Sequence, residues 1–244
     1  MTIEDLPYLR EIQLKRDGID SFDIYPYSIP AVQTLTSLRF HPNVTFFIGE
    51  NGTGKSTLIE AIAVALGFNA EGGTKHSTFS TRRSHSNLHQ CLKTIKSFKH
   101  PRNGYFLRAE SFYNLATLMD ETGYYTTYSN KSLHEQSHGE SFMATLTTKL
   151  KGKGLYIMDE PEAALSPTRQ LAALTAIHDL VKDDSQFIIA THSPILLAYP
   201  NAKIYHFSEN GIDTVSYQDT EHYSVTKNFL NRHEQMLNHL LSEN

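Results

Sequence analysis

Short apolar runs recur along this chain, each bounded by glycine, proline or polar residues. Three of them, at residues 44–48, 155–158 and 187–190, are apolar at nearly every position. Runs of this length and character are typical of strands buried on both faces of a parallel sheet. Apolar residues at helical spacing lie between the runs, over residues 57–66 and 171–181. The alternation predicts an α/β fold with a mostly parallel core sheet.

The remaining segments predict how this core is extended. Alternation over residues 8–14, followed by a turn at Asp17 and Gly18, indicates a β-rich N-terminal lobe. The polar segment 69–140 predicts a small helical or variable lobe inserted in the core, within a single domain over residues 1–244. Further elements are expected as strands at 105–109, 203–207 and 212–217, helical turns at 114–119, a loop at 124–131, and helices at 142–150 and at the C-terminus.

Composition narrows the class of protein. The chain has 244 residues, of which 39% are hydrophobic, enough for one large domain with a sizeable core. The net charge of the whole chain, −4, does not indicate nucleic-acid or membrane binding. Cys91 is the single cysteine, which excludes an internal disulfide framework and suits a reducing compartment. With no signal pattern and no apolar run long enough to span a bilayer, we expect a soluble cytoplasmic protein without membrane insertion.

The most specific chemistry follows the first apolar run. Residues 49–56 fit the phosphate-loop pattern G-x-x-x-x-G-K-[ST] at every fixed position, between an expected strand and an expected helix. Backbone N–H groups of such a loop surround phosphate oxygens, Lys55 reaches the β- and γ-phosphates, and the Ser56 hydroxyl ligates magnesium. The pattern predicts a bound nucleoside triphosphate. The expected binding residues are Gly49, Glu50, Asn51, Gly52, Thr53, Gly54, Lys55, Ser56 and Thr57.

Polar residues at two other strand ends can complete this site. Asp159 ends a buried strand and can hold magnesium, and Glu160 beside it can orient or deprotonate the attacking water. His192 follows the next strand, on the side of such a sheet where ligands bind, and can contact a γ-phosphate. The alternatives are a solvated acidic turn and a structural histidine.

A second phosphate-binding helix start is expected near residue 140. Small residues and a glycine precede a helix that we expect to begin at Ser141, so its N–H groups point outward. Because this segment has no lysine, a site shared between two subunits would explain it.

Taken together, these motifs resemble those of ABC-type ATPases, above all the small stand-alone predicted ATPases near the chromosome-maintenance and DNA-repair branch. Ser137-His138-Gly139-Glu140-Ser141 resembles a variant of the signature Leu-Ser-Gly-Gly-Gln. Ala164-Leu165-Ser166-Pro167 resembles the loop that follows the catalytic glutamate and touches the partner subunit. The resemblance covers nearly the whole chain.

The resemblance implies a P-loop NTPase of the ABC-ATPase type that hydrolyses ATP with Mg²⁺. It implies a homodimer that forms head to tail on ATP, in which Ser137 and Gly139 of one subunit complete the γ-phosphate cage of the other. Glu160 and His192 are then the catalytic residues, and Ser56 and Asp159 hold the metal. Hydrolysis would remove the γ-phosphate that links the two subunits, and the dimer would open.

Two positions depart from this family pattern. Glu110 stands where the family has a glutamine linking the two lobes, and its carboxylate would add negative charge near magnesium, so a metal role for it stays open. An aromatic residue for adenine stacking is expected near Tyr25 and Tyr27, although both are equally explained as packing residues of the N-terminal lobe.

The biological role has three alternatives: an ATPase of a DNA-linked repair or defence system, the nucleotide-binding subunit of a transporter, or a regulatory ATP switch for a protein partner. Long coiled-coil arms do not fit between Glu110 and Ser137. Residues 72–104 contain no Asp or Glu, so this basic segment can track a DNA backbone, present a solvated surface or dock an acidic protein. Its basic residues are Lys75, Arg82, Arg83, Lys93, Lys96, Lys99 and Arg102.

Overall fold

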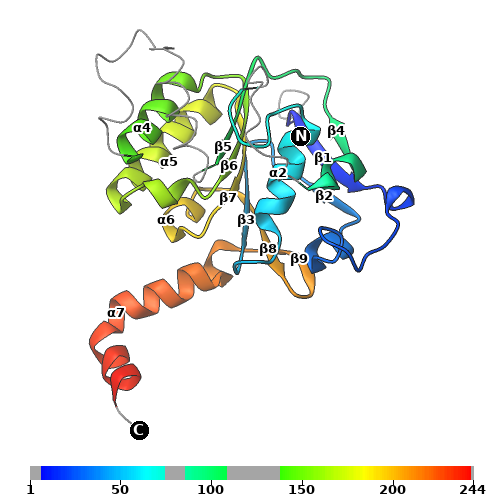
Figure 1. The fold of residues 1–244 in the computed structure, drawn as a ribbon. Coiled ribbons are helices and arrows are strands. Elements are labelled where there is room, and N and C mark those ends of the chain that lie inside the picture. Colours follow the sequence, from blue (N-terminus) through cyan, green and yellow to red (C-terminus); the bar gives the residue numbers. More distant parts are fainter. Residues whose placement is uncertain (1–6, 75–85, 109–137, 243–244) are drawn as a thin grey trace.

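A six-stranded sheet lies at the centre of the computed structural model, which describes residues 7–74, 86–108 and 138–242 (Figure 1). The strand order is β5-β6-β7-β3-β8-β9. Every neighbouring pair is parallel except β8 and β9, which form an antiparallel pair at the edge. The predicted α/β class with a mostly parallel sheet is confirmed. The strands are β3 (Val44–Gly49), β5 (Asn103–Arg108), β6 (Gly154–Asp159), β7 (Gln186–Ala190), β8 (Lys203–Ser208) and β9 (Gly211–Val215).

A second, three-stranded antiparallel sheet forms the β-rich N-terminal lobe, with the order β2-β1-β4. Its strands are β1 (Leu9–Leu14), β2 (Ser37–Arg39) and β4 (Leu92–Lys96). Strand β4 lies within the segment 69–140, which we expected to form a small helical or variable lobe. It is a strand because it pairs with β1 along its length, from Lys96 opposite Leu9 to Leu92 opposite Leu14. Two exposed lysines in its five residues conceal the strand pattern in the sequence.

Helices cover both faces of the central sheet (Figure 1). On one face lie α4, α5 and α6, and on the other lie α2 and the small sheet. The helices are α1 (Pro30–Gln33), α2 (Lys55–Ala65), α4 (His138–Ala144), α5 (Pro167–Lys182), α6 (Pro194–Leu197) and α7 (Glu221–Leu241). Short helical turns are η2 (Arg16–Gly18), η3 (Asn87–Cys91), η5 (Thr145–Lys149), η6 (Pro161–Ala164) and η7 (Tyr217–Asp219).

Strand β3 divides the hydrophobic core into two halves. Phe47 packs with Ile59 of α2 on one face of the sheet, whereas Phe46 and Ile48 pack with Ile177 of α5 on the other. Each of these side chains is at most 2% exposed, and burial of one such side chain contributes about 1.5–3 kcal/mol. Burial on both faces therefore fixes β3, and with it the loop that follows, in the middle of the molecule.

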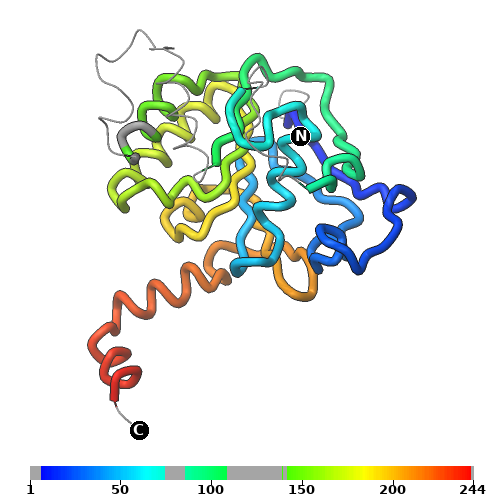
Figure 2. The backbone as a smooth tube through the Cα atoms, viewed as in Figure 1, coloured from blue at the N-terminus to red at the C-terminus, as the bar shows by residue number. Residues whose placement is uncertain are grey.

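The C-terminal helix α7 extends away from this body (Figure 2). The expected helix is confirmed, but its apolar side chains are exposed, among them Val225, Leu230 and Leu240. Its start is fixed by Thr220, whose buried hydroxyl accepts a hydrogen bond from the N–H of Tyr223. Within the described ranges, no helix combines the length and the apolar character needed to cross a bilayer. The elements expected at 114–119 and 124–131 lie outside those ranges.

Candidate nucleotide-binding site

The phosphate loop requires glycine at particular positions. Gly49 has a φ of 140°, and a Cβ atom there would lie 2.2 Å from the carbonyl oxygen of Phe207 on β8. Gly54 has a φ of 96°, and a Cβ atom would lie 2.6 Å from Ile29. Neither position accepts a side chain without movement of its neighbours. The loop therefore runs close against β8 and α1 and delivers the chain directly into α2, whose N-terminus carries partial positive charge.

Lys55, the first residue of α2, is folded into this loop. Its side chain is buried, with the residue 4% exposed. The ammonium donates hydrogen bonds to the backbone carbonyls of Gly49 and Glu50, both at 2.8 Å. Burial lowers the pKa of Lys55, while the carboxylates of Glu160 and Asp159 oppose that shift. A positive charge is thus held inside the loop that the motif predicts to bind phosphate.

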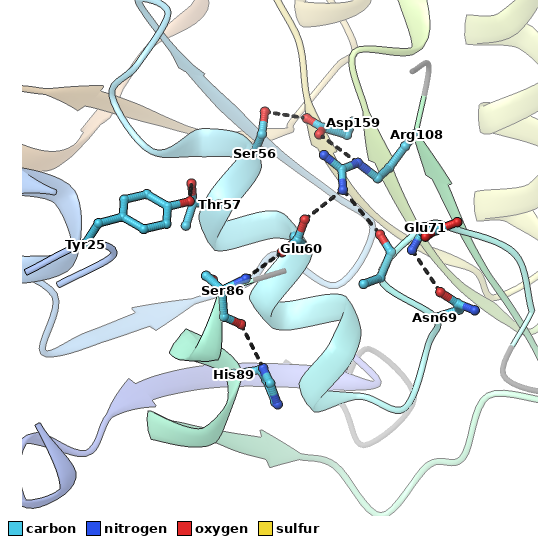
Figure 3. A network of polar contacts seen from close by, with 11 residues as sticks. Tyr25, Ser56, Thr57, Glu60, Asn69, Glu71, Ser86, His89, Arg108 and Asp159 are labelled. Carbon is cyan, nitrogen blue, oxygen red and sulfur yellow. Dashed lines mark hydrogen bonds and ion pairs between the residues drawn. The ribbon is translucent and has the colours of Figure 1, made fainter. Parts of the chain in front are cut away.

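Ser56 and Asp159 meet at the end of the central sheet (Figure 3). The Ser56 hydroxyl donates a 3.0 Å hydrogen bond to Oδ1 of Asp159. A hydroxyl and a carboxylate oxygen are the hard ligands that Mg²⁺ prefers, and Mg²⁺ is usually held by one or two carboxylates together with substrate phosphates. The two predicted metal ligands therefore fit the ion. Glu110, the third, lies outside the described residues.

Arg108 is a residue of this site that the sequence analysis missed. It ends β5 and lies opposite Asp159 in the parallel register. Its Nε is 3.8 Å from Oδ2 of Asp159, and Nη1 donates to Glu60 of α2 at 2.7 Å (Figure 3). Both Arg108 and Glu60 side chains are less than 20% exposed. The guanidinium therefore partly balances the charge of the Asp159 carboxylate. The sequence signal that could have identified Arg108 is its position at the end of a strand.

Glu160 and His192, the two predicted catalytic residues, lie next to each other in the structure. Glu160 has a left-handed backbone with a φ of 51°, and its N–H donates to the carbonyl of Ala190 on β7 at 3.0 Å. Such a conformation in a residue other than glycine is costly and often marks a functional position. Oε1 of Glu160 lies 3.7 Å from Nε2 of His192. The two strand ends that the sequence singled out are therefore adjacent.

Glu162 and His222 surround His192, and the sequence analysis identified neither. The backbone N–H of His192 donates to Oε1 of Glu162. Nδ1 of His192 lies 3.3 Å from Nε2 of His222, at the start of α7. His192 and His222 border a cavity of about 520 Å³ beside the phosphate loop. Its lining includes Gly49, Glu50, His192, His206, Glu221 and His222. Nothing in the sequence pattern connects residue 222 with residue 192.

The region that resembles a signature is only partly described. The described part of helix α4 already includes His138–Ser141, so these residues are helical, upstream of the expected start at Ser141. Gly139 is buried, and a Cβ atom would lie 2.7 Å from the carbonyl oxygen of Ala164 and 2.4 Å from Arg169. The signature-like segment and the loop that follows Glu160 are therefore packed together within one chain. Ser137 lies outside the described residues.

The two tyrosines considered for adenine stacking have different surroundings. Tyr25 is 64% exposed, and its hydroxyl is 3.5 Å from that of Thr57, in the first turn of α2 (Figure 3). Tyr27 packs against the hydrophobic core, and its hydroxyl is 3.3 Å from Sγ of the buried Cys91. Tyr27 is thus a packing residue, whereas Tyr25 presents a ring next to the phosphate loop.

The basic segment 72–104 does not form one continuous cationic surface in its described part. Lys93 and Lys96 are exposed on β4. Lys99 instead pairs with the carboxylate of Asp184 at 3.2 Å. Lys75, Arg82 and Arg83 lie outside the described residues.

Several solved structures are similar to the chain. The SMC head domain from Thermotoga maritima is 15% identical, with 85% of this chain and 98% of that chain covered and a TM-score of 0.46. The SmcHead bound to the C-winged helix domain of ScpA is 14% identical, with 86% and 98% covered and a TM-score of 0.48. A nucleotide-free ATP-binding cassette from an ABC transporter is 19% identical, with 81% and 88% covered and a TM-score of 0.45.

The comparison with curated proteins gave no match. A family model described as an AAA domain matches residues 17–187, well over half of the chain. The resemblance to P-loop ATPases that the motifs predicted is confirmed by this family match. The matched range includes β3, the phosphate loop, α2 and β6. The chain therefore belongs to the AAA domain family.

Proposed function

We propose that this protein binds and hydrolyses ATP in the presence of Mg²⁺. The observation that carries the proposal is the meeting of Lys55, Ser56 and Asp159 around one glycine loop. The buried ammonium, the hydroxyl and the carboxylate come from α2 and from the end of β6. Such a set supplies a cation for the phosphates and oxygen ligands for the metal. The bound Mg²⁺ would supply charge neutralisation for the transferred phosphoryl group.

Glu160 is the proposed general base. Its carboxylate follows the metal-binding Asp159 directly, and its side chain is 41% exposed, so water can reach it. His192, 3.7 Å away, is the proposed γ-phosphate contact. A positioned carboxylate that removes a proton from water typically contributes 10²–10⁴-fold to a rate. Tyr25 is the proposed platform for adenine, because its exposed ring stands beside Thr57.

A head-to-tail homodimer on ATP remains part of the proposal. Its support is the lysine-free segment Ser137–Ser141 and the packing of Gly139 against the loop at Ala164. This packing also determines which variant can test the proposed dimer. Gly139→Asp would clash with the carbonyl of Ala164 inside one subunit, so it reports on folding as well as on dimerisation. Glu160→Gln is the better variant, because it keeps the bound ATP and leaves the packing intact.

A DNA-linked repair or defence role is the biological context that we propose. Among the residues that the structure describes, the support for this role is two exposed lysines on β4, Lys93 and Lys96. A transporter subunit and a regulatory switch for a protein partner are the alternatives. The expectation of a cytoplasmic protein rests on the lone cysteine and the absence of a signal pattern, and it stays a prediction.

The proposed function is tested by equilibrium binding of Mg-ATP. Wild-type protein should bind, and Lys55→Ala should lose binding by roughly 10- to 100-fold, because a hydrogen-bonded charge on the phosphates is removed. Glu234→Gln, on the exposed surface of α7, is the control and should bind like wild type. Equal binding by wild type and Lys55→Ala would contradict the site. Sedimentation of Glu160→Gln with and without ATP then tests the dimer, and a monomer in both conditions would exclude the shared site.

A further inference from the structure

We propose that His222 is a positioning residue for His192. Its Nε2–H donates to Nδ1 of His192 and thereby fixes the tautomer of His192 whose Nε2–H faces Glu160. The role rests on the proposed function, because it concerns the same site. It adds a residue from the first turn of α7, a helix that the phosphate-loop chemistry does not otherwise use.

The geometry brings the two imidazoles together from distant parts of the chain. Nε2 of His222 and Nδ1 of His192 are 3.3 Å apart, and the ring centroids are 5.4 Å apart. The first turn of α7 is held in place by the buried Thr220, which caps it. The other side of His192 is fixed as well, since its backbone N–H donates to Glu162.

A pair of neutral imidazoles has two possible hydrogen-bond arrangements, because each ring carries one donor and one acceptor. If Nδ1 of His192 donates, its Nε2 bears a lone pair that would repel a carboxylate or a phosphate oxygen. If Nδ1 accepts from His222, Nε2 of His192 bears the proton. This proton then faces Glu160, whose Oε1 lies 3.7 Å away. Only the second arrangement equips His192 to contact a γ-phosphate.

The burial pattern favours the second arrangement. Nε2 of His192 is buried and makes no hydrogen bond with the described residues. A buried polar atom of this kind usually has a partner, so a donor aimed into the site points to an acceptor that arrives with the ligand. Nδ1 of His222 is also buried without a hydrogen bond there. In the proposed arrangement that atom is an acceptor lone pair, so the unpaired N–H of the pair is the one at Nε2 of His192, which faces the site.

Burial and nearby charges lower the pKa of His222, which favours the neutral ring that this arrangement needs. Burial is the largest cause, and the nearby His192, Lys55 and His206 add to the shift. Glu221 opposes it. These groups come from the loop after β7, the start of α2, β8 and α7 itself, so the packed elements other than α7 disfavour a proton on His222.

The first test reads the tautomer directly, without nucleotide or turnover. Nitrogen-15 NMR of the histidine rings in the full chain should show His192 protonated at Nε2. His222→Phe keeps a ring but no donor, and His222→Asn keeps an amide that is too short to reach. Both should shift the His192 nitrogens towards a tautomer mixture, whereas His222→Gln, with an amide nitrogen near the Nε2 position, should restore the wild-type pattern. His233→Gln, at an exposed position of α7, is the control.

The second test is ATP turnover by the same variants. His222→Phe and His222→Asn should lower kcat about tenfold with little change in KM, because one hydrogen bond is lost, and His222→Gln should recover most of it. Unchanged His192 nitrogens and unchanged kcat in both His222→Phe and His222→Asn would overturn the proposal. If wild type itself shows no ATP turnover, the proposed function fails, and the NMR measurement alone decides whether His222 positions His192.

Discussion

The hydroxyl of Ser56 donates a 3.0 Å hydrogen bond to the carboxylate of Asp159, although 103 residues separate them in the chain. Ser56 lies in the first turn of α2, and Asp159 is the last residue of β6. The contact therefore ties the phosphate loop to the acidic strand end. In the proposed function, both oxygens would be ligands of Mg²⁺.

Ser56→Ala should raise the Mg²⁺ concentration needed for half-maximal ATP turnover and lower the maximal rate, each by roughly tenfold, because one oxygen ligand and its hydrogen bond are removed. ATP binding without metal should be nearly unchanged, since Lys55 is intact. The measurement is turnover as a function of Mg²⁺ at saturating ATP. Ser242→Ala, at the end of α7, is the control, and an unchanged Mg²⁺ requirement in Ser56→Ala would remove Ser56 from the metal site.

Arg108→Met should destabilise the fold by about 1–3 kcal/mol, because it leaves the mostly buried carboxylate of Glu60 without its guanidinium partner. Glu60→Leu combined with Arg108→Met should recover part of this loss, since no unpaired charge then remains at position 60. Urea unfolding of the two single variants and the double variant completes the cycle. Strictly additive effects would show that the two residues do not act as a pair.

Much of this site was predictable because its chemistry is local. The phosphate loop is contiguous, and the apolar runs of β3, β6 and β7 are unmistakable, so the carboxyl ends of neighbouring parallel strands had to place Asp159, Glu160 and His192 near the loop. Arg108 was missed because its partners follow from strand register. His222 was missed because the start of α7 reaches the site only through the fold.

Strand β4 and Gly139 illustrate a different difficulty. Lys93 and Lys96 make β4 look like a polar loop, but it is an edge strand whose exposed positions tolerate charge. Gly139 packs against the carbonyl oxygen of Ala164, a contact between segments that are distant in sequence. Local patterns carry no information about contacts of this kind.

Gly49→Ala should cost about 2 kcal/mol or more in the free energy of unfolding, because its Cβ would meet the backbone of Phe207, its partner on β8, at 2.2 Å. Gly67→Ala is the matched control, since Gly67 also has a positive φ, of 89°, but nothing lies within 4 Å of its Cβ position. Thermal and urea unfolding compare the two. Equal losses would attribute the whole effect to backbone strain and none to the close approach of β8.

The stability of the protein should fall as the pH drops below about 6.5, the ordinary histidine pKa. Burial lowers the pKa of His41, with a contribution from Lys203, and Nδ1 of His41 accepts from the N–H groups of Asn43 and Val44. The folded pKa thus lies below the unfolded one. The unfolded chain binds more protons between the two values, so stability is fully present above the unfolded pKa and is lost as the pH falls towards the folded pKa.

His41→Asn isolates this contribution. Its side-chain oxygen can accept the same N–H groups without titrating, so the variant should lose less stability than wild type between about pH 7.5 and 5.5. The exposed His233→Asn on α7 should keep the wild-type slope. Urea midpoints at the two pH values provide the measurement. An identical slope in His41→Asn and wild type would assign the pH dependence to other groups.

The proposed ATP hydrolysis depends most directly on Glu160 as the base that activates water. The decisive measurement is phosphate release from Mg-ATP by wild type and Glu160→Gln, with ATP binding measured on the same samples. We expect Glu160→Gln to bind ATP like wild type and to release phosphate about 100- to 10,000-fold more slowly, because the amide keeps the shape of the side chain but cannot take the proton. Phosphate release at the wild-type rate by Glu160→Gln would contradict the account.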